Sequence, residues 1–205
     1  LRGMAYGGLY DQVGGGFSRY SVDPRWHVPH FEKMLYDNAQ LISLYAEAYG
    51  LYQEPLYKEV IVHTLEFLDR ELARPEGGYF ASLDADSLDK EGKLTEGAYY
   101  VWTEEELKRA LEKDFEWFRD YYNIDDFGHW EEGNHVLIRK ESDEEFAAKM
   151  GWSIQKLHAH IAGTRERLLR IRENRPRPRL YNKLMTSWNG LLLSGLCDAY
   201  RYCGL

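Results

Sequence analysis

The chain has 205 residues, of which 44% are hydrophobic and 29% are charged, and its formal net charge is −8 at pH 7. These proportions are typical of one globular domain and exclude a disordered chain, and the acidic balance argues against a general nucleic-acid binder. No apolar run reaches the roughly 18 residues of a membrane span, and two cysteines six residues apart in one predicted helix could not bridge, so we expect a soluble, cytoplasmic protein.

The first third of the chain predicts three helical segments. Residues 1–6 are typical of the last turn of a helix that ends at Gly7-Gly8, which suggests that the chain begins inside a larger unit. A long helix is expected to start near Pro29 and run to about Tyr49, because apolar residues recur there at 3.6-residue spacing. The next helix is expected at residues 56–72.

Two short β-rich runs follow, at residues 79–83 and 98–102, and we expect them to pair as antiparallel strands. Thr103 and Glu106 have the spacing of a capping box, so a helix should begin there and bury Leu107 and Leu111. Further helices are expected at residues 143–150, 154–173 and 187–202, with a Pro/Arg-rich linker at residues 174–179.

The chain also resembles itself. Gly15-Gly16-Phe17 recurs as Gly77-Gly78-Tyr79, and the helix segment that begins with Asn38 recurs at Asn189, 151 residues later. Such repeats predict stacked αα-hairpins, of which about three fit this length. The expected fold is therefore mainly α, a partial (α/α)₆ toroid with short β-hairpin loops that forms one domain over residues 1–205. Asn38 and Asn189 should each hydrogen-bond the backbone of a neighbouring loop or helix.

Chemistry-bearing side chains are concentrated in residues 10–38. On the predicted helix, His30, Lys33 and Asp37 would share a polar face, and the helix dipole would favour a neutral His30 that could act as a base. We expect these three to line one cavity with the turn at residues 14–17 and with Asp84 and Asp86, because the two Gly-Gly loops should open on the same rim. The alternative is a solvated helix face.

Other motifs are weaker. The three glycines at residues 14–16 lack the features of a phosphate loop. The acidic run around Asp84 departs from a calcium loop, and the histidine pairs have no third ligand nearby. The arginines of residues 165–179 suit a solvated helix face and linker better than an anionic partner. We therefore expect no metal, no cofactor and no nucleic-acid partner.

Several of these motifs resemble one family. They are GGLYDQVGGGF (residues 7–17), RYSVD (19–23), PHFEKMLYDNA (29–39), SLDADS (82–87), YYVWT (99–103), EGN (132–134) and TSWNGL (186–191). The chain resembles the thioredoxin-domain-containing spermatogenesis-associated protein 20 family. That resemblance implies a toroid like those of N-acylglucosamine 2-epimerase and cellulase-like glycosidases, preceded by a thioredoxin-like domain that is absent from this chain. The family's Asp-Asp-Lys stands here as Tyr181-Asn182-Lys183.

The resemblance, together with tryptophans beside carboxylates, predicts a carbohydrate-active domain of epimerase or glycosidase type that takes a sugar-like ligand. A hydrolase would need one protonated and one ionised carboxyl group, whereas an epimerase would use His30 as proton acceptor. The candidate catalytic residues are His30, Asp37, Asp84, Asp86, Glu96 and Glu132. The candidate ligand-binding residues are Arg19, Trp26, Lys33, Trp102, Asn134, Lys183 and Trp188.

Two further expectations follow from an incomplete toroid. The first is the alternative function, a non-catalytic scaffold that supports the thioredoxin-like domain of the intact protein. The second is self-association, because Leu191, Leu192, Leu193 and Leu196 place apolar surface near the end of the chain, where a toroid would continue.

Overall fold

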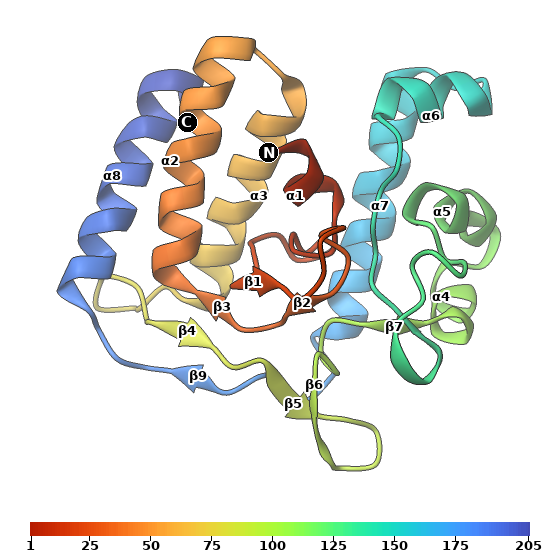
Figure 1. Ribbon diagram of the computed structural model, residues 1–205, viewed down its shortest axis with the longest axis horizontal. Coiled ribbons are helices and arrows are strands. Elements are labelled where there is room, and N and C mark those ends of the chain that lie inside the picture. The colour runs from red at the N-terminus through yellow and green to blue at the C-terminus, as the bar shows by residue number, and fades with distance from the viewer.

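The computed structural model describes all 205 residues and is mainly α-helical. Figure 1 shows two groups of helices, with α1, α2, α3 and α8 in one group and α4 to α7 in the other, and with most of the short strands along one end of the molecule. None of the helices combines the length and the apolarity that crossing a membrane requires. The helices are α1 (Arg2–Tyr6), α2 (Leu35–Tyr52), α3 (Pro55–Glu71), α4 (Glu104–Leu111), α5 (Phe115–Tyr122), α6 (Asp143–Met150), α7 (Ile154–Arg172) and α8 (Thr186–Cys203).

Helix α2 is the centre of the first group and packs against both α3 and α8. Its buried side chains, among them Leu35, Ile42 and Tyr45, join those of α3 and α8 in one apolar core. A Cβ atom at Gly195 would lie 2.7 Å from the carbonyl oxygen of Ala39, so the absence of a side chain there lets α8 approach the backbone of α2.

The strands are two or three residues long and antiparallel. Strand β1 (Tyr20–Ser21) pairs with β2 (Pro29–His30), and β5 (Asp86–Leu88) pairs with β6 (Leu94–Glu96). A three-stranded sheet has the order β3, β4, β9, formed by Lys33–Met34, Ser82–Leu83 and Leu180–Tyr181. Strand β7 (Trp102–Thr103) pairs with β8 (Asn134–His135).

The predicted start of the long helix is wrong by six residues. Helix α2 begins at Leu35, because the preceding segment is extended and is held in β2 and β3 by pairing with other strands. Phe31 shares the 3.6-residue spacing but is buried in a separate core with Tyr100 and Val136. His30 is therefore a strand residue, and the argument that a helix dipole keeps it neutral does not apply.

The predicted pairing of residues 79–83 with 98–102 is also wrong. Strand β4 lies between β3 and β9, and β7 pairs with β8 instead. Each partner comes from a part of the chain at least 30 residues away, and local sequence pattern carries no information about such pairings.

The second group of helices has its own core, to which α4, α5, α6 and α7 contribute. The capping box of Thr103 and Glu106 is confirmed, with Leu107 and Leu111 buried as predicted. The predicted α6 and α7 are confirmed, and Ser142 and Glu145 form a second capping box. The sequence analysis did not find α5, whose aromatic side chains fill this core.

The internal repeat is confirmed in its contacts. The Asn38 amide accepts a hydrogen bond from the Phe17 N–H at 2.7 Å and donates to the Phe17 carbonyl at 3.0 Å. Asn189 makes the same pair of bonds with the backbone of Tyr79, at 2.8 and 3.0 Å. Each amide also donates to the carbonyl four residues earlier. The structural role predicted for both asparagines is therefore borne out.

The outer side of α8 carries exposed apolar side chains. Leu191 and Leu193 are 38% and 64% exposed, and Leu184 and Met185 before the helix are exposed as well. Leu192, in contrast, is buried against α2 and α3. Both cysteines are free, with Cys197 exposed and Cys203 buried.

Candidate functional site

Six acidic or imidazole side chains gather where β1 to β6 and β9 meet the start of α2. We call this surface, with the Arg19, Tyr20 and Tyr181 side chains beside it, the carboxylate face. Its members come from segments as distant in the sequence as Arg19 and Tyr181, brought together by strand pairing. The six are His30, Glu32, Asp37, Asp84, Asp86 and Glu96.

His30 and Glu96 form a carboxylate–imidazole pair on this face. The His30 Nδ1 atom lies 2.7 Å from the Glu96 carboxylate, and the ring stacks on Tyr20 with 4.9 Å between ring centroids. A carboxylate at Nδ1 favours the tautomer that carries its proton there, which leaves the lone pair on Nε2. The side chain is 29% exposed. The arrangement can therefore accept a proton at Nε2 while Glu96 stabilises the resulting imidazolium.

Carboxylates are crowded around this pair. Glu96 lies directly opposite Asp86 in the β5–β6 ladder, and like charges in that relation are unfavourable. Asp84, two residues before Asp86, accepts hydrogen bonds from the Tyr181 hydroxyl at 3.0 Å and from the Asp86 N–H at 3.3 Å. Tyr181 thus supplies a hydrogen-bond donor to Asp84 rather than another carboxylate.

Asp37 differs from its neighbours because one of its carboxyl oxygens is buried and has no hydrogen-bond partner. Burial raises the pKa of Asp37 to about 6, Arg19 opposes the shift, and Glu32 adds to it. Arg19 is itself paired with Glu32 at 3.0 Å. A carboxyl group that keeps its proton up to about pH 6 is suited to donate it near neutral pH.

An aromatic pair lies at the same ends of α2 and α8. Tyr36 and Trp188 meet edge to face, with 4.8 Å between ring centroids. Both side chains are half-buried, so part of each ring is open to solvent. The structure thus brings Trp188 against Tyr36, the residue before Asp37 in α2.

The structure places other predicted residues elsewhere. Trp102 is fully buried and has the Arg175 guanidinium 3.9 Å from its ring centroid, which makes it a core residue. Asn134 is in β8, paired with Thr103. Glu132 is exposed in a turn with φ of 54°.

Two further predicted ligand-binding residues are exposed, and neither forms a hydrogen bond or an ion pair with a side chain of the carboxylate face. The exposed Trp26 lies against the first helix, with its ring close to Gly3. Lys183, the counterpart of Lys33 in the repeat, is exposed and makes no ion pair.

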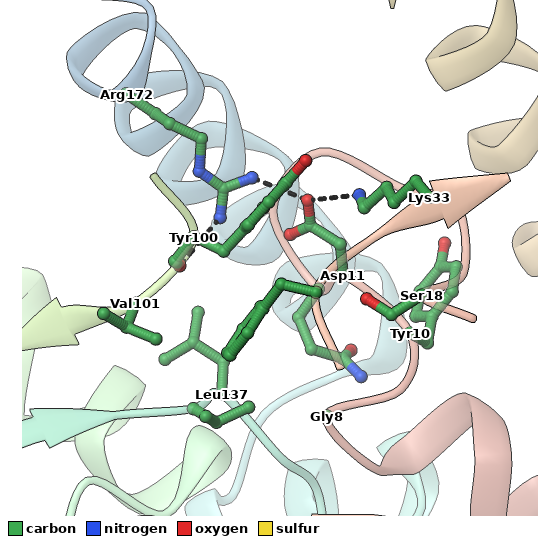
Figure 2. A pocket seen from close by; sticks show the side chains of 12 residues that line it. Gly8, Tyr10, Asp11, Ser18, Lys33, Tyr100, Val101, Leu137 and Arg172 are labelled. Carbon is green, nitrogen blue, oxygen red and sulfur yellow. Dashed lines mark hydrogen bonds and ion pairs between the residues drawn. The ribbon is translucent and has the colours of Figure 1, made fainter. Parts of the chain in front are cut away.

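Lys33 is buried, with 1% of its side chain exposed, and donates to Asp11 and to the Gly15 carbonyl, both at 2.8 Å. Figure 2 shows Asp11 between Lys33 and Arg172. Beside this cluster is a small cavity. The volume that the centre of a water molecule can occupy in it is about 20 Å³. This cavity has room for one or two waters and is too small for a sugar ring. Of the side chains expected to share one cavity, only Lys33 lines this one.

Sequence reasoning missed Tyr20, Tyr181 and the His30–Glu96 pair. The alternation of side-chain direction along β2 and β6 could indicate this pair, but only once the register of the strands is known. No three histidine, cysteine, aspartate or glutamate side chains lie close enough together to hold a metal ion.

Comparison with known proteins gives a consistent set of relatives, although no family model matches the chain. Human spermatogenesis-associated protein 20 is 36% identical over 95% of this chain, and the mouse protein of that name is equally similar. An uncharacterised protein of Caenorhabditis elegans is 37% identical over 98% of the chain. The chain spans 27% of the human protein and 30% of the nematode protein, a little over a quarter of their length.

Proposed function

We propose, from the premise that the chain belongs to the spermatogenesis-associated protein 20 family, that it forms part of an (α/α)₆ toroid whose carboxylate face binds a sugar-like ligand and transfers protons to and from it. The repeated asparagine contacts of α2 and α8 support the toroid, because they give two hairpins the same loop-to-helix junction. The activity belongs to carbohydrate metabolism and is of the epimerase or isomerase type.

The observation that carries this proposal is the His30–Glu96 pair. His30 Nε2 takes the proton from the carbon next to the carbonyl of an open-chain sugar, so the C–H bond breaks and an enolate forms. Glu96, 2.7 Å from Nδ1, stabilises the imidazolium. The protonated Asp37 carboxyl then returns a proton to that carbon, and its raised pKa suits that step.

A glycosidase reaction on the same face is the closest chemical alternative. There Asp37 would protonate the leaving oxygen, and Asp84 or Asp86 would act as the ionised partner. The proton-transfer route is favoured because an oriented imidazole has no part in the hydrolytic one.

Ligand binding tests the location of the site. Sugars such as N-acetylglucosamine, N-acetylmannosamine, glucose and mannose are titrated into the isotope-labelled 205-residue chain, and amide and ring signals are followed by NMR. We expect at least one sugar to shift the signals of Tyr20, His30 and Glu96 and the indole signal of Trp188. Shifts confined to α4–α7, or no shifts with any sugar, would contradict the proposal.

A matched pair of variants sharpens the titration. His30→Gln should weaken binding or change the shift pattern. His158→Gln should not, although His158 is also paired with a carboxylate, Asp143 at 2.9 Å, on the other group of helices. Equal effects of the two variants would place the ligand away from the carboxylate face.

A second candidate function is a non-catalytic scaffold that supports a thioredoxin-like domain in the intact protein. The exposed apolar side chains of α8, Leu191 and Leu193 among them, favour it because a soluble domain seldom leaves such a strip uncovered. If so, adding the thioredoxin-like domain of a family member to the isotope-labelled chain should shift the NMR signals of the α8 residues. The free cysteines support a reducing, cytoplasmic setting for either function.

A further inference from the structure

A buried cluster of charges lies at the junction between the two groups of helices. Asp11 accepts hydrogen bonds from Lys33 at 2.8 Å and from Arg172 at 2.7 Å, and its other oxygen accepts from the N–H groups of Val13 and Gly14. Burial acts to raise the pKa of Asp11, but Arg172 and Lys33 outweigh it and hold that pKa well below its ordinary value. All of the accepting positions of this carboxylate are thus in use.

Hydrogen-bond donors in the same place are not all in use. The hydroxyl groups of Tyr99 and Tyr100 and the Nε–H of Arg172 are buried and have no partner. All three residues line a second cavity next to the cluster. A guanidinium N–H can only donate, and a phenol hydroxyl readily donates, so three of the side chains that line this cavity carry a donor that lacks an acceptor.

The charges around this cavity do not cancel. Three cations, Lys33, Arg70 and Arg172, face two carboxylates, Asp11 and Glu71. Glu71 accepts from Arg70 at 2.9 Å and from Arg177 at 2.7 Å, and it accepts from none of the three unpaired donors. One positive charge is in excess in a site that excludes most solvent. Buried charge of this kind is unfavourable unless a counter-charge is present.

We propose that this cavity is a binding site for one small monovalent anion, of which chloride is the physiological example. The space open to the centre of a water molecule is about 10 Å³, which fits a single small ion and excludes polyatomic organic anions. The anion accepts from the Tyr99, Tyr100 and Arg172 donors and joins α3, α7 and the segment before β7. It therefore stabilises the junction between the two groups of helices.

Halide dependence of folding tests the proposal. The chain is unfolded with urea, which supplies no anion, in sodium chloride, sodium bromide or sodium gluconate at equal ionic strength. Because only the folded chain has the site, chloride at ten times its dissociation constant should raise the folding equilibrium constant about tenfold over gluconate, and above the dissociation constant the folding equilibrium constant should rise in proportion to the chloride concentration. Equal stability in all three salts would mean that the cavity holds only water and would overturn the proposal.

Variants and diffraction make the test specific. Tyr100→Phe removes one donor and keeps the ring, so the halide response should fall. Tyr45→Phe should keep the response, because that buried hydroxyl donates to the Leu1 carbonyl away from the cavity. Should Tyr100→Phe fail to fold, bromide-soaked crystals of the unaltered chain should show an anomalous peak in the cavity. No peak, or a peak without halide-dependent stability and thus an adventitious ion only, would overturn the proposal.

Discussion

Three buried cations of this chain each contact a carboxylate, whereas the half-buried Asp37 forms no ion pair. Lys33 and Arg172 share Asp11, and Arg139 pairs with Asp143. Asp37 keeps a buried carboxyl oxygen without a partner and has a raised pKa. Perturbed groups of this kind concentrate at functional sites. At the level of single residues, this contrast separates the fully hydrogen-bonded carboxylate of Asp11 from the unpartnered carboxyl group of Asp37, which is the one proposed to transfer a proton.

Replacing Asp37 should change the pH dependence of stability. The folded-state pKa of about 6 lies above the ordinary aspartate pKa of 3.8, so the folded state binds the proton more tightly and stability falls as pH rises between about 4 and 6. Asp37→Asn removes this loss. We expect the variant to be more stable than the unaltered chain at pH 7 by about 1 kcal/mol, a figure discounted for the half-exposed side chain.

Urea unfolding at pH 4 and pH 7 measures this effect. The gain should be present at pH 7 and small at pH 4, where Asp37 keeps its proton in the folded chain. A variant that loses stability at pH 7 would show that the Asp37 carboxylate has a stabilising partner.

Asp11→Asn should destabilise the chain strongly, by about 3–5 kcal/mol, because it leaves Lys33 and Arg172 as buried cations without a counter-charge. The depressed pKa of Asp11 means that its contribution is present above about pH 4 and is lost as pH falls below that value. The difference in stability between the two chains should therefore shrink in acid. A loss below 1 kcal/mol at pH 7, measured by urea unfolding, would be incompatible with the ion-pair cluster described here.

At the scale of elements, local signals predicted what local contacts determine. Helices α3, α6, α7 and α8 and the capping box at Thr103 agree with the sequence because capping and apolar spacing act within a few residues. The segment before α2 has helical spacing and is nevertheless extended, since pairing with β1 and β4 outweighs it. Helix α5 escaped notice because buried aromatic residues cover most of its surface and leave a weak pattern.

The two asparagines of the repeat offer a comparison within one chain. Asn38 is fully buried, so Asn38→Ala leaves the Phe17 N–H and carbonyl groups without partners and should cost about 1–3 kcal/mol. Asn189 is only half-buried, and water can replace part of its bonding to Tyr79. Asn189→Ala should therefore cost less. If thermal or urea unfolding showed the same loss of stability for both variants, the difference in exposure between the two asparagines would not affect their contribution to stability, contrary to this prediction.

For the whole molecule, the sequence predicts members of the carboxylate face but not their arrangement. The motifs indicate His30, Asp84, Asp86 and Glu96, and these side chains do lie on one face. The His30–Glu96 contact joins residues 66 apart and depends on the pairing of β1 with β2 and of β5 with β6. Lys33 and Trp102 were chosen for the chemistry of their side chains, whereas their burial follows from packing between distant segments.

The exposed side of α8 predicts association. Leu191 and Leu193, with Leu184 and Met185 before the helix, present apolar side chains to solvent, and covering them gains roughly 25 cal/mol per Å². Sedimentation of the isolated chain should show mass that rises with concentration, and Leu193→Glu should shift it toward the monomer. A compact monomer at every concentration, with or without the substitution, would show that this surface needs no partner.

Exchange with solvent deuterium measures the proposed proton transfer to and from a sugar at His30. The chain is incubated in D₂O with N-acetylglucosamine or N-acetylmannosamine, and deuterium at C2 is followed by NMR. The unaltered chain should incorporate deuterium, His30→Gln should do so roughly 100-fold or more slowly because it lacks the base, and His158→Gln should match the unaltered chain. Deuterium incorporation that is absent with every sugar, or equally fast in His30→Gln, would contradict the account.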